Sequence, residues 1–157
     1  MPDRSRMPRR LRQILVHLPS RCGHDSTMEY LTSTDAVSSR QLSGFFAGWP
    51  SPPSPERHLA LLRGSSHVVL ARTDDEIIGF VTAISDGALA AYIPLLEVRR
   101  EWQGQGVGGE LLRRLLGQLE AFYMVDVVCD PALIPFYERF GMAPLAGLAR
   151  RNRSALA

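Results

Sequence analysis

The chain has 157 residues, a hydrophobic fraction of 45% and a charged fraction of 22%. This size fits one domain with one core, and the composition is that of an ordinary globular protein. No apolar run approaches the roughly 18 residues that span a bilayer, so we expect a soluble, cytoplasmic protein without membrane partners.

The two cysteines, Cys22 and Cys129, lie far apart in the sequence and make a poor disulfide framework. Cys129 ends an apolar run, where a small buried residue is favoured over a nucleophile. No Cys/His pair has the spacing of zinc ligands, so no metal is expected.

Positive charge is concentrated at the N-terminus. Residues 1–24 carry six Arg and one Asp, a net charge of +5, whereas residues 25–157 carry a net charge of −3. We therefore divide the chain into a basic extension, 1–27, and a domain, 28–157. The extension fits three interpretations: a surface helix or added strand, a targeting peptide, or translation from a start site upstream of Met28. The body lacks a basic field, so no nucleic-acid partner is expected.

The first part of the domain predicts two helices around a stiff loop. Thr34 or Asp35 can cap a helix that runs toward Phe46. Four prolines within residues 49–55 remove hydrogen-bond donors and fix φ, which excludes regular structure there. A second helix follows over 54–64, with serine at its cap, proline at its first position and glycine at its end.

Apolar runs bounded by turn residues predict five strands. Thr73-Asp74-Asp75 is typical of a hairpin turn between the second and third of them. Pro94 interrupts the fourth, because proline has no N–H to pair. The expected strands cover residues 28–32, 68–72, 76–85, 88–98 and 125–129.

An amphipathic helix is expected over 106–122, with its leucines on one side and its charged residues on the other. A short helix over 133–140 should end at Gly141, and residues 142–151 could supply one or two closing strands. The order of these elements predicts an α+β domain whose later part is a strand–helix–strand crossover.

A glycine-rich run lies between the fourth strand and the amphipathic helix. Glycine allows φ > 0 and close approach of a ligand, and the first N–H groups of a helix lack internal partners and carry partial positive charge. Such a terminus suits a phosphate, which we favour over a simple turn. The run comprises Gln103, Gly104, Gln105, Gly106, Val107, Gly108 and Gly109.

The same run also fits the dinucleotide pattern G-x-G-x-x-G through Gly104, Gly106 and Gly109. That interpretation is disfavoured because the glycines do not directly follow the first strand. Fewer than fifty residues follow Gly109, which is too few for the remaining strands of a dinucleotide fold.

The alternative pattern Q-x-x-G-x-G is filled by Gln103, Gly106 and Gly108. Residues 92–108 resemble the fourth strand and pyrophosphate loop of the GNAT superfamily of acetyl-CoA-dependent N-acetyltransferases, and residues 130–142 resemble its last helix. The resemblance implies a mixed, mostly antiparallel central sheet with strands four and five splayed apart, flanked by about four helices. It also implies acetyl-CoA as co-substrate.

The resemblance assigns roles to individual residues. The backbone of Leu96, Glu97 and Val98 should bond the pantetheine arm in the gap between the splayed strands, and Tyr137 aligns with the family's general acid. Tyr137 lies about 100° from Phe136 and Phe140 on a helix, so those two are expected in the core and Tyr137 in the active site.

The positions that often hold a base in the family correspond to Tyr92 and Pro94, neither of which suits that role. By period-two alternation Glu97 should face away from Tyr92, as a surface charge. A water-relayed proton exit is therefore expected.

The resemblance places the acceptor pocket between the early helices and the splayed strands, with Phe45, Trp49 and Tyr92 as candidate wall residues. Trp49 could equally be a packing anchor. We expect a small-molecule amine or a peptide as acceptor, and a monomer or homodimer. Three alternatives stay open: a protein acetyltransferase, a non-catalytic coenzyme A-binding regulator, and a nucleic-acid-associated protein that uses the basic extension.

Overall fold

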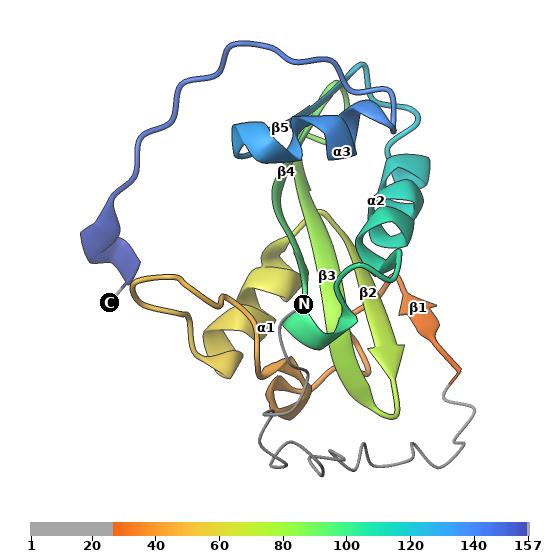
Figure 1. The fold of residues 1–157 in the computed structure, drawn as a ribbon, viewed down its shortest axis with the longest axis vertical. Coiled ribbons are helices and arrows are strands. Elements are labelled where there is room, and N and C mark those ends of the chain that lie inside the picture. The colour runs from red at the N-terminus through yellow and green to blue at the C-terminus, as the bar shows by residue number, and fades with distance from the viewer. Residues whose placement is uncertain (1–26, 157) are drawn as a thin grey trace, which may run out of the picture.

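The computed structural model describes residues 27–156, so the predicted basic extension lies, apart from Thr27, outside the described residues. One five-stranded sheet runs through the domain, with α2 on one face and α1 on the other (Figure 1). The strands are β1 (Glu29–Leu31), β2 (His67–Thr73), β3 (Glu76–Ser85), β4 (Ala90–Val98) and β5 (Met124–Val127). The helices are α1 (Pro55–Gly64), α2 (Val107–Gln118) and α3 (Ile134–Glu138), with 3₁₀ helices over Ser39–Leu42, Arg100–Trp102, Pro131–Leu133 and Arg153–Leu156.

The strands are ordered in space as they are in sequence. β1 to β4 pair antiparallel, and β5 pairs parallel to β4 after the α2 crossover. The β2–β3 hairpin closes through Asp74 and Asp75, whose φ angles of 47° and 64° are those of a tight hairpin turn. The mostly antiparallel α+β sheet and the hairpin are therefore as predicted.

The first predicted helix is wrong in extent. Instead of a helix from Thr34 toward Phe46, the chain forms one 3₁₀ turn over Ser39–Leu42. The positive φ angles of Gly44, Phe46 and Gly48 then turn the backbone repeatedly, which no right-handed helix allows. The sequence showed the glycines but not the left-handed conformation of Phe46.

The second helix begins as predicted. The Ser54 side chain accepts a hydrogen bond from the backbone nitrogen of Arg57 at 3.2 Å, and Pro55 occupies the first helical position. α1 ends at Gly64, so the proline-rich loop and this helix confirm the sequence-based boundaries.

Two apolar layers hold the sheet between its helices. On one face, Leu111, Leu112 and Leu115 of α2 pack against β2, β3 and β4. On the other face, α1 and the 3₁₀ turn cover a second layer that contains Phe45, Phe46 and Phe80. α2 ends at Gln118, four residues before the predicted limit, although Leu119 is still buried.

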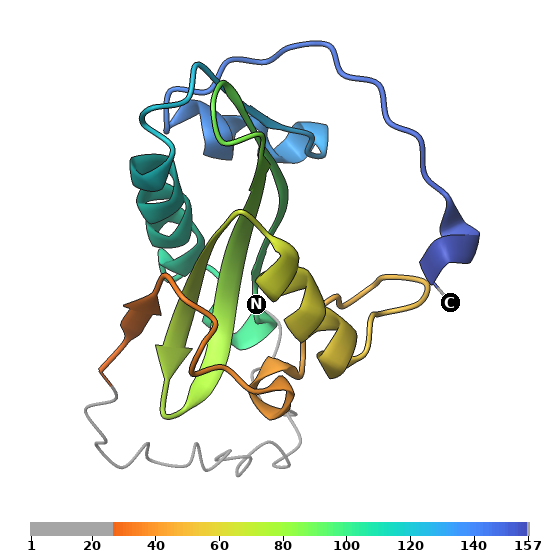
Figure 2. The ribbon, with the colours of Figure 1, turned by 180° about the vertical axis from the view of Figure 1, so that it is seen from behind.

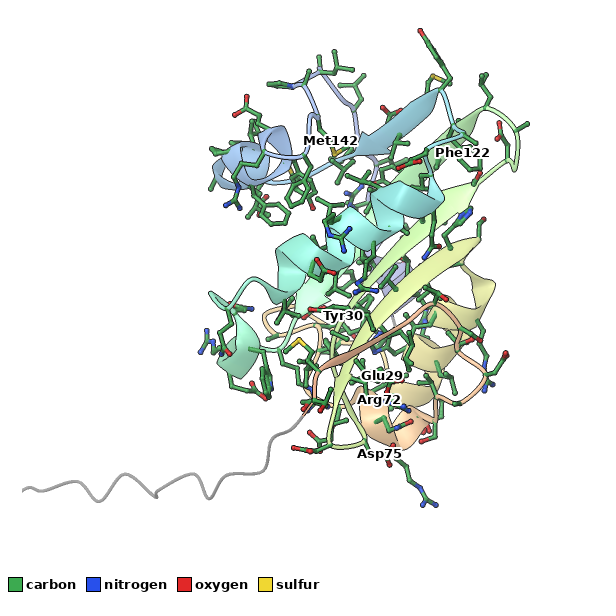
Figure 3. All side chains as sticks on the ribbon, turned by 90° about the vertical axis from the view of Figure 1, so that its right-hand side faces the viewer. Glu29, Tyr30, Arg72, Asp75, Phe122 and Met142 are labelled. Carbon is green, nitrogen blue, oxygen red and sulfur yellow. The ribbon has the colours of Figure 1, made fainter. Side chains whose placement is uncertain are left out.

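β1 is tied to the sheet by its side chains as well as its backbone. Arg72 Nη2 lies 2.6 Å from Glu29 Oε2, and Figure 3 shows the two residues beside each other. Arg114 of α2 stacks over the Tyr30 ring at 4.5 Å, so this three-residue strand is held from both sides.

The C-terminal segment differs from expectation. α3 and the left-handed Gly141 (φ 80°) agree with the predicted short helix and its end. Residues 142–151 form no strand; they run as an extended arm away from β5 and around the molecule toward α1 (Figures 1 and 2). The prediction of closing strands is wrong, because residues 142–151 pair with no strand among residues 27–156.

Candidate active site

β4 and β5 separate where the sequence places Pro94. Their parallel pairing ends at Ile93 opposite Val127, while β4 continues beside β3 as far as Val98. The edge of β4 beyond Pro94 is therefore free of β5, which is the predicted splay. An extended ligand chain can use the free backbone groups of this edge as an added strand would.

A bulge at Ile93 and Pro94 changes the side-chain alternation of β4. Thr82 pairs with Leu95 and Ile84 with Tyr92, so β4 has one residue more than β3 between these pairs. Residues paired directly across the strands share a face, and Phe80, Thr82 and Ile84 share one. Their partners, Glu97, Leu95 and Tyr92, must share it too.

The expectation that Glu97 faces away from Tyr92 is therefore wrong, and so is its assignment as a surface charge. Glu97 Oε1 accepts a hydrogen bond from the backbone nitrogen of Phe46 at 2.6 Å, and the Ala47 amide also bonds the carboxylate. Successive amides in a turn of alternating φ sign make a concave anion site, which this carboxylate occupies. Burial raises the pKa of Glu97, although both amides oppose the shift.

The glycine run has the backbone shape expected for an anion cradle. Gly104 (φ 72°) and Gly106 (φ 84°) are left-handed, and Gly106 is the N-cap of α2 without a side-chain cap. A Cβ at either residue would meet nothing within 4 Å, so conformation rather than space demands glycine. The first amides of α2 therefore point from an uncapped helix end that carries partial positive charge.

Side-chain contacts fix this loop to β4 and α3. Gln103 Nε2 donates to the Val98 carbonyl at 2.8 Å, and Gln105 Nε2 donates to the Glu101 carbonyl at 2.9 Å. A Cβ at Gly109 would lie 3.5 Å from Phe140 Cζ, so Phe140, two residues beyond the end of α3, lies against the start of α2. The structure thus brings together the two motifs that carried the family resemblance.

Tyr137 is more buried than predicted. It is 7% exposed and belongs to the core layer beneath α2, whereas Phe136 and Phe140 are only partly buried around it. Burial, and to a lesser extent the nearby Cys129, raises the pKa of its phenol. Tyr137 also belongs to the lining of a cavity of about 600 Å³ beside β5, so it is both a core residue and a wall residue of that cavity.

The candidate acceptor residues fall into two environments. Phe45 is 8% exposed and packs edge-to-face on His58 and Phe80, so it is part of the core. Trp49 and Tyr92 remain 41% and 37% exposed. Trp49 packs edge-to-face on Phe46 with ring centroids 5.2 Å apart, which agrees with a packing anchor that keeps one exposed side.

Residues 34–142, more than half of the chain, match the sequence profile of the Acetyltransferase (GNAT) family. The chain belongs to this family. It is therefore an acyltransferase by family, and the family in general uses acetyl-CoA as acyl donor.

Individual relatives agree with the family match. A candidate acetyltransferase from Deinococcus radiodurans R1 is 48% identical, with a TM-score of 0.77 over 79% of this chain and 87% of that chain. The uncharacterised N-acetyltransferase ycf52 of Porphyra purpurea is 26% identical over 71% of this chain and 68% of that protein. Serotonin N-acetyltransferase of Mesocricetus auratus is 40% identical over 58 residues, which are 35% of this chain and 28% of that protein.

Sequence patterns did not indicate the burial of Arg99 and His58 in the GNAT domain. Arg99 is 8% exposed; it bonds Glu76 Oε2 at 2.7 Å and the Gln41 carbonyl at 3.2 Å. It thereby ties the start of the glycine loop to β3 and the 3₁₀ turn. His58 is 1% exposed among aromatic rings, and no spacing signal marks either residue.

Among residues 27–156, no cluster of three or more His, Cys, Asp or Glu side chains is arranged to hold a metal ion. None of the helices within the same residues combines the length and apolar character needed to span a bilayer.

Proposed function

We propose that this GNAT domain is an N-acetyltransferase that moves the acetyl group of acetyl-CoA to a primary amine by direct attack. The observation that carries the proposal is the uncapped, left-handed start of α2 at Gly104 and Gly106. Amides at such a helix end supply both hydrogen bonds and positive potential for a pyrophosphate. Gln103 through Gly109 would hold that group.

The free edge of β4 fits the rest of the donor. Leu96, Glu97 and Val98 lie beyond the last β4–β5 pair, so their outward backbone groups are available to a pantetheine amide. This edge begins at the splay and leads toward the glycine loop, to which Gln103 connects Val98. An extended arm along β4 would place its two ends at the loop and at the splay.

Tyr137 is the candidate general acid. When the amine nitrogen attacks the acetyl carbonyl, the carbon–sulfur bond breaks and the departing thiolate needs a proton. A phenol with a raised pKa stays protonated at neutral pH and can donate it. The phenolate then recovers a proton from solvent.

The surplus proton of the amine leaves through water. Tyr92 and Pro94 still offer no base, but the bulge puts the half-buried Glu97 carboxylate on the same face as Tyr92. Water molecules along this face could pass the proton toward Glu97 and on to solvent. Its bond to the Phe46 amide means that Glu97 would end such a relay rather than touch the amine.

The acceptor would lie on the α1 side of β4. The exposed aromatic rings of Trp49 and Tyr92 favour an apolar or aromatic amine. A polyamine would instead require a pocket lined by acidic residues. A peptide amine fits the same chemistry. A cytoplasmic location would suit these substrates.

Thiol release from acetyl-CoA over a panel of amines and peptides tests the proposal, together with calorimetry using coenzyme A alone. Binding together with turnover of at least one amine is the expected result, and the preferred acceptor separates a small-molecule enzyme from a protein acetyltransferase. Binding without turnover across the panel would indicate a non-catalytic coenzyme A-binding regulator instead. Absence of binding would refute the cradle and the proposal with it.

A further inference from the structure

Part of the α1 face of the sheet is uncovered near the point where β4 and β5 separate. Along β3, Phe80 and Thr82 are fully buried on this face, whereas Ile84 is 54% exposed. Figure 1 shows α1 beside the lower half of the sheet, while the end of β3, the start of β4 and β5 lie at the upper end. The cover that α1 provides therefore ends before this face reaches the upper end of the sheet.

Asp126 of β5 lies on this open surface. Its neighbours Val125 and Val127 pack against the core layer beneath α2, so alternation along β5 turns Asp126 to the α1 face. Strand pairing agrees, because Asp126 is the register partner of Tyr92, which shares the α1 face with Ile84. A carboxylate and an aromatic ring therefore lie on adjacent strands, one residue before the last β4–β5 pair.

Asp126 differs in its bonding from two other carboxylates near this face. The Asp126 side chain is exposed and makes no hydrogen bond or ion pair with any of residues 27–156. Asp86, in the β3–β4 turn, accepts hydrogen bonds from the amides of residues 88, 89 and 90 at 2.9 to 3.1 Å. Glu97 accepts from the Phe46 amide. Those two carboxylates are already engaged, whereas Asp126 can bind a cation from outside the chain.

An organic ammonium ion fits the pair formed by Asp126 and Tyr92. A carboxylate attracts the charge and accepts N–H hydrogen bonds, and the face of an adjacent aromatic ring adds a cation–π interaction. Ile84 and Met124 are 54% and 38% exposed on the same face, so they offer apolar contacts to the body of such a ligand. Exposed ion pairs are weak alone, so affinity requires the ring and the apolar contacts as well.

We propose that Asp126 and Tyr92 form an ammonium subsite on the acceptor side, and that this subsite selects primary amines with an apolar body. The inference rests on the acetyl transfer proposed above, in which one end of the donor lies at the splay. A primary amine in neutral water is an ammonium ion, which is the form that a carboxylate attracts. Asp126 holds it beside the strand separation, and the surplus proton then leaves through water before the nitrogen attacks. Asp126 is thus a specificity residue.

Calorimetry in the presence of coenzyme A tests the subsite without catalysis. Phenethylamine and hexylamine, both cations at pH 7, are compared with 2-phenylethanol and 1-hexanol, the uncharged alcohols of the same carbon skeletons. The wild-type protein should bind each amine about tenfold more tightly than its alcohol. Asp126→Asn should abolish this preference.

Asp35→Asn is the matched control, because it removes the same charge from an exposed residue outside the sheet. This variant should keep the preference for amines. Equal affinity of the wild-type protein for amine and alcohol, no binding of either amine, or an unchanged preference in Asp126→Asn overturns the subsite.

Steady-state kinetics separates this inference from the proposed function. Asp126→Asn should raise the KM for either amine about tenfold, with the KM for acetyl-CoA unchanged, because the carboxylate contributes to acceptor binding. Acetylation of these amines with the same amine KM in variant and wild type would refute the subsite and leave acetyl transfer standing. Amine binding that depends on Asp126 but gives no turnover would refute acetyl transfer and leave a cation-binding site.

Discussion

The carboxylate of Glu97 on β4 lies 2.6 Å from the backbone nitrogen of Phe46, 51 residues earlier in the chain. Phe46 has a φ angle of 60°, an unfavourable conformation for a bulky side chain. The contact therefore holds a strained turn against the strand that carries the predicted cofactor edge. It couples the shape of the proposed acceptor side to β4.

Removing this carboxylate should destabilise the domain. Glu97→Gln keeps one acceptor oxygen and should lower the free energy of unfolding by about 1 kcal/mol, whereas Glu97→Ala leaves partly buried amides unpaired and should cost about 2–3 kcal/mol. Glu120→Gln, on an exposed residue, should stay within about 0.5 kcal/mol of wild type. Urea unfolding measures all three, and a Glu97→Ala curve equal to wild type would contradict the role.

His58 should make stability depend on pH. Burial lowers the pKa of its imidazole from 6.5 to about 4, and the Leu42 carbonyl offsets only part of this effect. The unfolded chain therefore takes up the proton first on acidification. The contribution of His58 to the free energy of unfolding is constant above about pH 6.5. It falls by up to about 3 kcal/mol between pH 6.5 and 4 and is constant again below pH 4.

Chemical unfolding of wild type and His58→Leu across this pH range isolates the contribution of His58 to the pH dependence of stability. Neither His58 nitrogen has a hydrogen-bond partner of normal geometry among the described residues, so an apolar replacement should not lower stability at pH 7.5. The difference between the two curves should be flat above pH 6.5 and should favour the variant in acid. Parallel curves down to pH 4 would show that His58 does not titrate in this way.

Gly106→Ala should weaken coenzyme A binding by more than the accompanying loss of folding stability can explain. Alanine at φ 84° is strained by about 1 kcal/mol, and relief of that strain would redirect the amides at the start of α2. Gly87→Ala is the matched control. Gly87 also has a positive φ, 76°, a Cβ there would meet no atom within 4 Å, and the residue lies in the β3–β4 turn. Calorimetry with coenzyme A should show at least tenfold weaker binding for Gly106→Ala alone. Equal affinity for both variants would argue against the cradle.

Tyr137→Phe should reduce turnover without loosening the fold. The substitution keeps the ring, whose centroid lies 5.0 Å from that of Phe136, and removes only the hydroxyl group. Loss of a positioned acid lowers rates by about 100-fold or more, and the alkaline fall in the wild-type pH profile should disappear. Tyr123→Phe, at a residue 85% exposed, serves as control. Wild-type rates for Tyr137→Phe at every pH would remove the acid assignment.

Two glycines should respond to alanine in opposite directions. A Cβ at Gly79 would lie 2.9 Å from Leu111 Cδ1, so Gly79→Ala should push α2 from the sheet and cost about 1–3 kcal/mol. A Cβ at Gly117 meets nothing within 4 Å on α2, so Gly117→Ala should raise stability by about 0.5–1 kcal/mol. Thermal unfolding measures both variants; an unchanged or raised stability of Gly79→Ala would contradict the packing described at Gly79, and a lowered stability of Gly117→Ala would contradict the expectation at Gly117.

Local sequence signals determined the elements whose formation needs only neighbouring residues. Ser54 and Pro55 start α1, the aspartates at 74 and 75 close the hairpin, and the glycines at 104 and 106 adopt left-handed conformations at the loop. Each effect acts over a few residues through φ preference or capping, so the sequence carries it directly. Family membership followed from the same short motifs.

The tertiary structure alone decided how distant segments meet. The bulge at Pro94 reversed the expected face of Glu97, because side-chain alternation depends on the register with β3 and not on β4 itself. The burial of His58, the bonds of Arg99 and the open edge of β5 likewise depend on residues far away in the chain. Local propensity carries no information about such contacts, which packing and strand pairing determine.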